Sequence, residues 1–173
     1  MSVYKYSDLQ RSPRLRDSAV YKLESGLYSE KEKVSDLEII AKKYENAIFT
    51  LDSAYFYYGL TDNIPTHYHL ATKKRARKIN NLKVKQTYSV DDYFSIGDSS
   101  HLYNDIRLRI YDKERMLIEL VRNKNKMAYD MYKEIVNNYR GITDQLNFLK
   151  LQEYLKVFKN GDKLLKMIQE EVL

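Results

Sequence analysis

The side chains best suited to metal chemistry are two closely spaced histidines. His67 and His69 are two residues apart on an expected strand, so their side chains would share a face and could bind a metal ion. No third ligand is evident, because His101 lies far along the chain in a segment expected to be irregular. Surface or capping roles explain these histidines better than a metal site.

Carboxylates offer a second route to catalysis. Asp52 and Asp62 flank an expected helix, and paired carboxylates can hold Mg²⁺ for phosphoryl transfer. However, Asp52 suits the dipole of a first helical turn, and Asp62 suits a turn. The chain also has no glycine-rich phosphate loop, nucleophile elbow or HExxH motif. We therefore expect a binding protein rather than an enzyme, with no cofactor or metal; a hydrolytic nuclease is the remaining catalytic alternative.

Positive charge is the clearer chemical signal. The net charge is +6, and the densest basic run lies between two expected strands and continues onto the second, at Lys73, Lys74, Arg75, Arg77, Lys78, Lys83 and Lys85. Such a run can neutralise several phosphates at once and release their counterions. With Arg107 and Arg109 expected on the same sheet face, these residues predict a surface for nucleic acid or another acidic partner. A solvated, charged loop is the alternative.

A second basic group lies near the N-terminus. Arg11, Arg14 and Arg16 surround Pro13 and could form an arm that contacts DNA. A solvated chain terminus explains them equally simply, and we favour it because no complete DNA-binding motif accompanies them.

Tyrosine is unusually frequent, with 17 tyrosines and no tryptophan. Its large ring and polar hydroxyl suit interfaces and half-buried positions. Tyr55, Tyr57 and Tyr58 would cover more than one face of an expected helix. We expect Tyr55 and Tyr58 to pack in the core and Tyr57 to contact a partner.

The composition indicates a globular protein of a reducing compartment. Of the 173 residues, 43% are hydrophobic, which is enough for a core, and there is no cysteine for disulfides or thiolate sites. No apolar run is long enough to span a bilayer, and the first residues lack the apolar block of a secretory signal. We expect a soluble, cytoplasmic protein with no membrane partner.

The apolar segment 47–65 predicts a core helix over 51–59. Thr50 could cap its first turn, Gly59 could end it in a left-handed conformation, and Pro65 would prevent its continuation. Upstream, Ser35 and Glu38 form a capping box that predicts a helix over 36–45.

Hydrophobic periodicity assigns most of the remaining chain. It predicts a hairpin over 20–29 around Gly26, strands over 68–71, 82–88 and 106–111, and an irregular segment over 91–104. Asp112 could cap the first of four helices, with breaks at Gly141 and Asn160-Gly161. The sequence therefore predicts an α+β fold: a small mixed or antiparallel sheet with packed helices and a C-terminal helical subdomain, preceded by a vestigial winged-helix-like hairpin.

Three segments resemble the AbiEi-type antitoxins of type IV toxin–antitoxin systems, an abortive-infection family. Segment 21–29 is similar to the end of that family's winged helix, whose wing closes on Gly-Leu-Tyr. In segment 48–65, Ser53-Ala54 and Tyr58-Gly59-Leu60-Thr61 match the central helix and its Gly-Leu-Thr exit. Segment 106–122 matches a strand followed by a helix with Glu114-Arg115 and Val121-Arg122. The resemblance spans about residues 20–140.

The resemblance implies a role in phage defence. It implies a partial winged-helix segment over 1–32 and an antitoxin domain over 33–173, strand-rich to 111 and helical over 112–173. Such an antitoxin neutralises a nucleotidyltransferase-type toxin of the AbiEii class, directly or by opposing its effect on a shared target. The type IV assignment implies the second route.

The resemblance also implies transcriptional autoregulation through DNA binding. Only residues 1–19 precede the hairpin, too few for the complete helix-turn-helix that positions a recognition helix. We therefore expect weak or no sequence-specific operator binding. The alternative function is a nucleic-acid-binding accessory or transcriptional regulator without a toxin partner.

Overall fold

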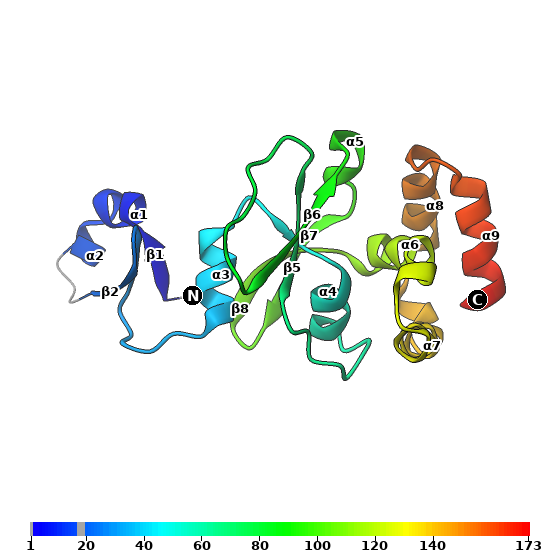
Figure 1. The fold of residues 1–173 in the computed structure, drawn as a ribbon, viewed down its shortest axis with the longest axis horizontal. Coiled ribbons are helices and arrows are strands. Elements are labelled where there is room, and N and C mark those ends of the chain that lie inside the picture. The colour runs from blue at the N-terminus through cyan, green and yellow to red at the C-terminus, as the bar shows by residue number, and fades with distance from the viewer. Residues whose placement is uncertain (1, 17–19) are drawn as a thin grey trace. The chain divides into compact units, whose positions relative to one another are not determined.

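The computed structural model describes residues 2–16 and 20–173 and has the predicted α+β fold (Figure 1). Its described residues form nine α-helices, a three-stranded antiparallel sheet and a five-stranded mixed sheet. The chain divides into two compact units, residues 1–46 with 101–108 and residues 47–100 with 109–173. This division does not coincide with the predicted boundary after residue 32.

The first unit contains the predicted hairpin. Strands β2 (Tyr21–Glu24) and β3 (Leu27–Ser29) pair antiparallel, and β1 (Val3–Lys5) adds to β3 to give the order β1-β3-β2. The helices of this unit are α1 (Tyr6–Arg11), α2 (Pro13–Arg16) and α3 (Asp36–Lys43). Strand β1 was not predicted, because a strand of three residues is too short to show an alternating pattern.

The capping box of α3 is only half formed. Ser35 Oγ accepts a hydrogen bond from the Glu38 backbone N–H at 3.2 Å, as predicted. The Glu38 carboxylate, however, accepts hydrogen bonds from the backbone N–H and hydroxyl of Ser2 instead of returning to Ser35. This contact ties α3 to the start of β1 within the first unit.

The five-stranded sheet has the order β6-β5-β4-β8-β7. Its strands are β4 (Ile48–Phe49), β5 (Tyr68–Lys73), β6 (Val84–Ser89), β7 (Asp98–Tyr103) and β8 (Ile106–Tyr111). The short central strand β4 is antiparallel to β5 and parallel to β8, while β5 and β6 are parallel. The predicted strands are confirmed, but β4 was assigned to no strand.

Segment 91–104 is not irregular, which corrects the prediction. It contains helix α5 (Asp91–Phe94) and most of strand β7. Strand β7 lies at the edge of the sheet, and its first three residues, Asp98, Ser99 and Ser100, are all exposed. A polar edge strand buries neither face, so it lacks the alternation on which the prediction relied.

Helix α4 (Leu51–Tyr57) ends as predicted and begins differently. At its end, Gly59 has φ +67°, the Leu60 N–H donates to the Tyr55 carbonyl at 2.8 Å, and the Gly59 N–H donates to Phe56 at 2.9 Å. These bonds form a Schellman motif. At its start, the Thr50 side chain makes no capping bond; its hydroxyl lies 3.8 Å from Met116 Sδ. Burial of Thr50 against α6 prevents the predicted cap.

The C-terminal helices pack together around α6 (Lys113–Arg122), as Figure 1 shows. They are α7 (Tyr129–Arg140), α8 (Phe148–Val157) and α9 (Gly161–Glu171), with 3-10 turns at Lys124–Lys126 and Thr143–Gln145. Asp112 caps α6, accepting from the Arg115 N–H at 2.8 Å, which confirms the prediction. None of the helices in the described ranges has the length and apolar character needed to cross a membrane.

Candidate functional site

The basic run forms an exposed connection between two parallel strands. Segment 73–78, which we call the basic segment, begins at the end of β5 and leads toward β6. All five of its cationic residues are exposed, and none forms an ion pair with any residue that the structure describes: Lys73, Lys74, Arg75, Arg77 and Lys78. Their charge is therefore available to an acidic partner.

Gln86 holds the basic segment against the sheet. Its side-chain amide donates to Thr72 Oγ1 at 2.8 Å and to the Arg77 carbonyl at 3.1 Å. Its carbonyl oxygen accepts from the Ile79 N–H at 2.7 Å. A turn bond from the Ala76 N–H to the Lys73 carbonyl at 2.9 Å adds a further restraint. Because the backbone is fixed at both ends, the cations are presented by an ordered loop.

The neighbouring basic residues differ in their availability. Lys83 and Lys85 are exposed, and Lys85 lies on β6 opposite His69 of β5. Arg109 is already engaged: its guanidinium binds the Asp98 carboxylate through Nε at 2.9 Å and Nη2 at 2.5 Å. This hydrogen bonding raises the pKa of Arg109 above its usual value. Arg109 is thus not part of a free positive surface, and Arg107 belongs to the first unit.

The N-terminal arginines lie in the first unit. Arg11 ends α1 and Arg14 lies in α2, and both are exposed. The Arg16 side chain lies outside the described part of the structure. Lys5 caps α1 through its backbone N–H, which donates to Asp8 Oδ2 at 2.9 Å.

Tyr57, the predicted contact residue, is buried rather than exposed. Its side chain is only 6% exposed, and its ring packs edge-on against Phe49 and Phe56. Tyr55 is fully buried, as expected, and donates to the Met116 carbonyl at 3.2 Å. The prediction placed Tyr57 at a contact surface because Tyr55, Tyr57 and Tyr58 cover more than one face of the helix. In the structure the Phe49 ring of β4 packs against Tyr57.

The histidines and carboxylates do not assemble into a metal site. His69 is 4% exposed, with Nε2 3.8 Å from Asp52 Oδ2, while His67 is exposed and pairs with Thr66. Asp62 is exposed. Within residues 2–16 and 20–173, no group of three or more His, Cys, Asp or Glu side chains could hold a metal ion.

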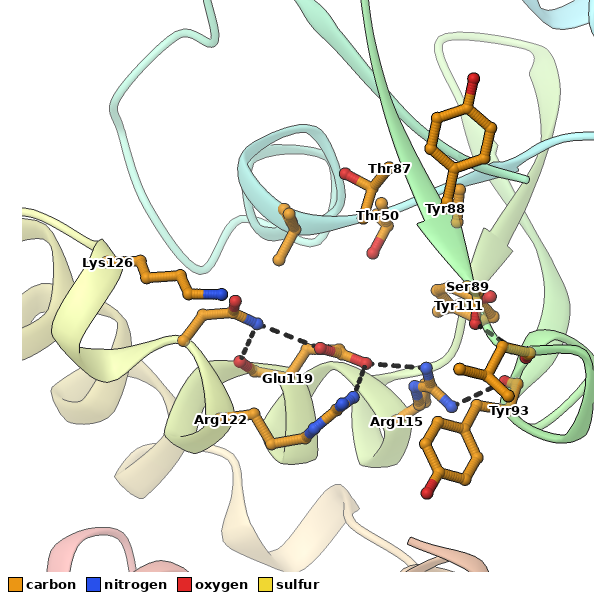
Figure 2. Close-up of a pocket in the computed structure, with 14 residues that line it drawn as sticks. Thr50, Thr87, Tyr88, Ser89, Tyr93, Tyr111, Arg115, Glu119, Arg122 and Lys126 are labelled. Carbon is orange, nitrogen blue, oxygen red and sulfur yellow. Dashed lines mark hydrogen bonds and ion pairs between the residues drawn. The ribbon is translucent and has the colours of Figure 1, made fainter. Parts of the chain in front are cut away.

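The second unit also contains a polar cavity of about 260 Å³ that the sequence analysis did not identify (Figure 2). Helix α6 and the residues after it line one side, through Arg115, Glu119, Arg122, Asn123 and Lys126. Figure 2 shows Thr50 and Thr87 across the cavity from Glu119 and Arg122, with Lys126 at one end. The remaining lining residues are Leu51, Ala71, Tyr88, Ser89, Val90, Tyr93 and Tyr111.

Glu119 organises the charged side of this cavity. Its Oε1 accepts from Arg115 Nη2 and from Arg122 Nη1, both at 2.7 Å, and its Oε2 accepts from Asn123 Nδ2 at 3.0 Å. One carboxylate thereby orients two guanidinium groups on the same face of α6, at spacings of four and three residues.

Arg115 is held on every side. Its guanidinium lies 4.7 Å from the Tyr111 ring and 4.5 Å from the Phe158 ring, and Nη1 donates to the Tyr93 carbonyl at 2.9 Å. The side chain is 2% exposed, and Nε has no partner among the described atoms. Burial also raises the pKa of the Tyr111 phenol to about 12. Arg115 is therefore a fixed positive charge beneath the cavity.

The backbone at the cavity edge is strained. Leu51 has φ +46°, in the left-handed region that residues other than glycine rarely occupy. Such strain persists only where the surrounding structure enforces it. Here the Thr50 N–H is fixed by the His69 carbonyl at 3.0 Å, and α4 starts directly afterwards. Thr50 and the strained Leu51 both line the cavity wall.

No known protein-family model matches the chain, and a search of curated proteins finds no significant relative. The residues that carry the antitoxin resemblance do have defined contacts in the second unit. Ser53 Oγ accepts from the His69 N–H at 2.8 Å, and Gly59 forms the Schellman motif. Arg115 and Arg122 belong to the cavity. Their spacing with Glu119 along one helix was the sequence signal that could have revealed this cluster.

Proposed function

We propose that this protein is a non-catalytic, cytoplasmic binding protein that acts as an antitoxin against a nucleotidyltransferase-type toxin. The observation that carries the binding role is the basic segment, whose five exposed cations have no carboxylate partner among the described residues. The antitoxin role rests on the resemblance of segments 21–29, 48–65 and 106–122 to AbiEi-type proteins.

The basic segment supports recognition of an acidic partner by electrostatic attraction. Several cations close together raise the rate of encounter with a negatively charged molecule and bind phosphates with strong salt dependence. Because Gln86 fixes the loop, little conformational freedom is lost on binding. The type IV resemblance favours a shared nucleic-acid target over direct contact with the toxin.

The antitoxin function is tested by co-expression with the product of the neighbouring gene, scoring growth. The informative variant replaces Lys73, Lys74, Arg75 and Arg77 with alanine. A matched control replaces four exposed lysines in and between helices α8 and α9, Lys156, Lys159, Lys163 and Lys166. We expect the wild type and the control to restore growth and the basic-segment variant to fail while remaining folded by circular dichroism. A toxic neighbour that the wild type does not neutralise would refute the antitoxin function.

The unpaired cations also favour a second candidate, a nucleic-acid-binding accessory or transcriptional regulator without a toxin partner. This function predicts binding to heparin and RNA that weakens steeply with salt, and a smaller salt slope for the basic-segment variant. It further predicts that the neighbouring gene product is not toxic. A gel shift on the upstream DNA tests operator binding, for which we expect weak or no sequence-specific binding.

A further inference from the structure

We propose that the cavity above Arg115 binds a phosphate-bearing nucleotide, with Arg122 and Lys126 contacting the phosphate. This site is separate from the basic segment, and the inference does not rest on the antitoxin function. It rests on the charge, the rigidity and the two-sided lining of the cavity (Figure 2).

The lining carries excess positive charge. It contains three cations, Arg115, Arg122 and Lys126, and one carboxylate, Glu119, so its formal net charge is +2. Lys126 forms no ion pair within the described ranges and is exposed. A concave site with uncompensated positive charge favours an anion of more than one negative charge, such as a phosphate monoester.

Glu119 orients the guanidinium groups but accepts only some of their N–H hydrogen bonds. Arg122 donates from Nη1 to Glu119, and its side chain is 34% exposed, so its other N–H groups can donate to a ligand. The Arg122 guanidinium also stands 4.9 Å from the Phe158 ring and 5.6 Å from the Tyr93 ring, which restricts its motion. A restrained guanidinium with free donors is suited to bidentate contact with phosphate.

Arg115 serves as a positioning residue. Its side chain is almost wholly buried, so it does not itself contact the phosphate. Its positive charge still adds to the electrostatic field in the cavity. Its bond to Glu119 fixes the carboxylate that in turn orients Arg122. The arrangement is a preformed anion site of the kind that needs little reorganisation on binding.

The remaining lining suits the rest of a nucleotide. Leu51, Ala71 and Val90 provide apolar contact for a base, and Thr50 and Thr87 lie across the cavity from Glu119 and Arg122. The Tyr88 ring points away from the arginines in Figure 2, so we assign it no stacking role. A volume of about 260 Å³ is near the lower end for ligand pockets, which favours one nucleotide unit over a dinucleotide.

The phosphate could belong to a free mononucleotide or to the phosphorylated end of an RNA strand. Titration calorimetry on the full chain with AMP, GMP, CMP, UMP and inorganic phosphate tests the first source. A short 5′-phosphorylated RNA and its dephosphorylated form test the second. We expect at least one phosphorylated probe to bind more tightly than inorganic phosphate, and the dephosphorylated RNA to bind more weakly than its phosphorylated form.

The variants separate this site from folding effects and from the basic segment. Arg122→Ala should weaken nucleotide binding by about tenfold or more, because a charge-assisted contact is lost. Lys126→Ala, which breaks no described ion pair, should weaken it without changing the thermal midpoint. The quadruple basic-segment variant should bind mononucleotides like the wild type, whether or not it neutralises a toxin. Absence of any nucleotide binding at millimolar concentration, or equal binding by the wild type and Lys126→Ala, would overturn the proposal.

Discussion

Arg115 Nη2 lies 2.7 Å from Glu119 Oε1 one turn along α6, and water reaches very little of either side chain. An ion pair out of water is tolerated only with good geometry and additional hydrogen bonds, because each charge loses its hydration. Here Glu119 accepts three hydrogen bonds, and Arg115 lies between two aromatic rings. The pair therefore links the stability of the second unit to the charge of its cavity.

Removing the Glu119 charge should be costly. Glu119→Gln would leave Arg115 buried without its counter-ion, and we expect the free energy of unfolding to fall by about 3 kcal/mol. Urea denaturation measures this change. Glu153→Gln, at an exposed position of α8, is the control and should change stability by less than about 0.5 kcal/mol. Equal, small effects of the two substitutions would show that the Arg115 charge is compensated elsewhere.

Two glycines with similar backbone conformations should respond differently to alanine. Gly97 has φ +75°, and an added Cβ would lie 2.3 Å from Arg115 Cβ; Gly59 has φ +67°, with nothing within 4 Å of an added Cβ. Gly59→Ala should cost only the left-handed conformation, about 1 kcal/mol. Gly97→Ala should cost about 3 kcal/mol, because overpacking against Arg115 is added.

Thermal or urea denaturation of the two glycine variants gives the comparison directly. Gly97→Ala should also weaken nucleotide binding, since it displaces the Arg115 stem, whereas Gly59→Ala should leave binding unchanged. If both substitutions lower the free energy of unfolding equally, the close approach of Gly97 to Arg115 adds no cost to the alanine substitution.

Acidification should destabilise the protein through His69. Burial lowers the pKa of His69 below its ordinary value of 6.5; Asp52 opposes this shift, and Lys85 and His67 add to it. The unfolded chain therefore takes up a proton more readily than the folded one as the pH falls through 6.5. The His69 contribution to stability is present above that pH and is lost progressively below it.

The measurement is the urea midpoint at about pH 7.5 and about pH 5.5, on either side of the ordinary histidine pKa. His69→Phe removes the titrating group and should reduce the loss of stability on acidification. His67→Phe, at an exposed position, removes only one of the smaller contributions to the shift, so it should reduce this loss less than His69→Phe does. An identical pH response of the wild type and His69→Phe would show that other titratable groups cause the loss of stability on acidification.

Gln86 should affect nucleic-acid binding without carrying charge. Gln86→Leu removes the bonds to Thr72, Ile79 and the Arg77 carbonyl, so the basic segment loses its anchor while all its cations remain. We expect affinity for RNA to fall about threefold to tenfold from the added ordering entropy, with little change in the salt slope. Asn138→Leu, which breaks a single bond to the Leu60 carbonyl, is a control for loss of a side-chain amide. A reduced salt slope for Gln86→Leu would instead mean that cationic contacts are lost.

The sequence predicted the elements whose signals are local. Ser35, Asp112 and Gly59 act within four residues of their partners, so their patterns can be read directly, and the structure confirms the helix boundaries that they define. The basic segment was likewise predicted, because exposure follows from a run of charge that cannot be buried.

The wrong assignments share a long-range cause. Thr50 could have capped α4, but its hydroxyl lies against Met116 of α6. Tyr57 could have faced solvent, but Phe49 of β4 packs against it. The two-residue strand β4 exists only because β5 and β8 pair with it on either side. The elements that contact Thr50, Tyr57 and β4 cannot be inferred from the residues adjacent to them in the chain.

The sequence by itself thus determined the fold class, the helix ends marked by Ser35, Asp112 and Gly59, and the location of the exposed positive charge, because each depends on composition or on contacts within about one turn. Only the tertiary structure brought Tyr93, Tyr111 and Phe158 around Arg115 and placed Thr50 and Thr87 across from Glu119. The physical reason is that a buried charge requires partners on all sides, and those partners come from segments that meet only when the chain is folded.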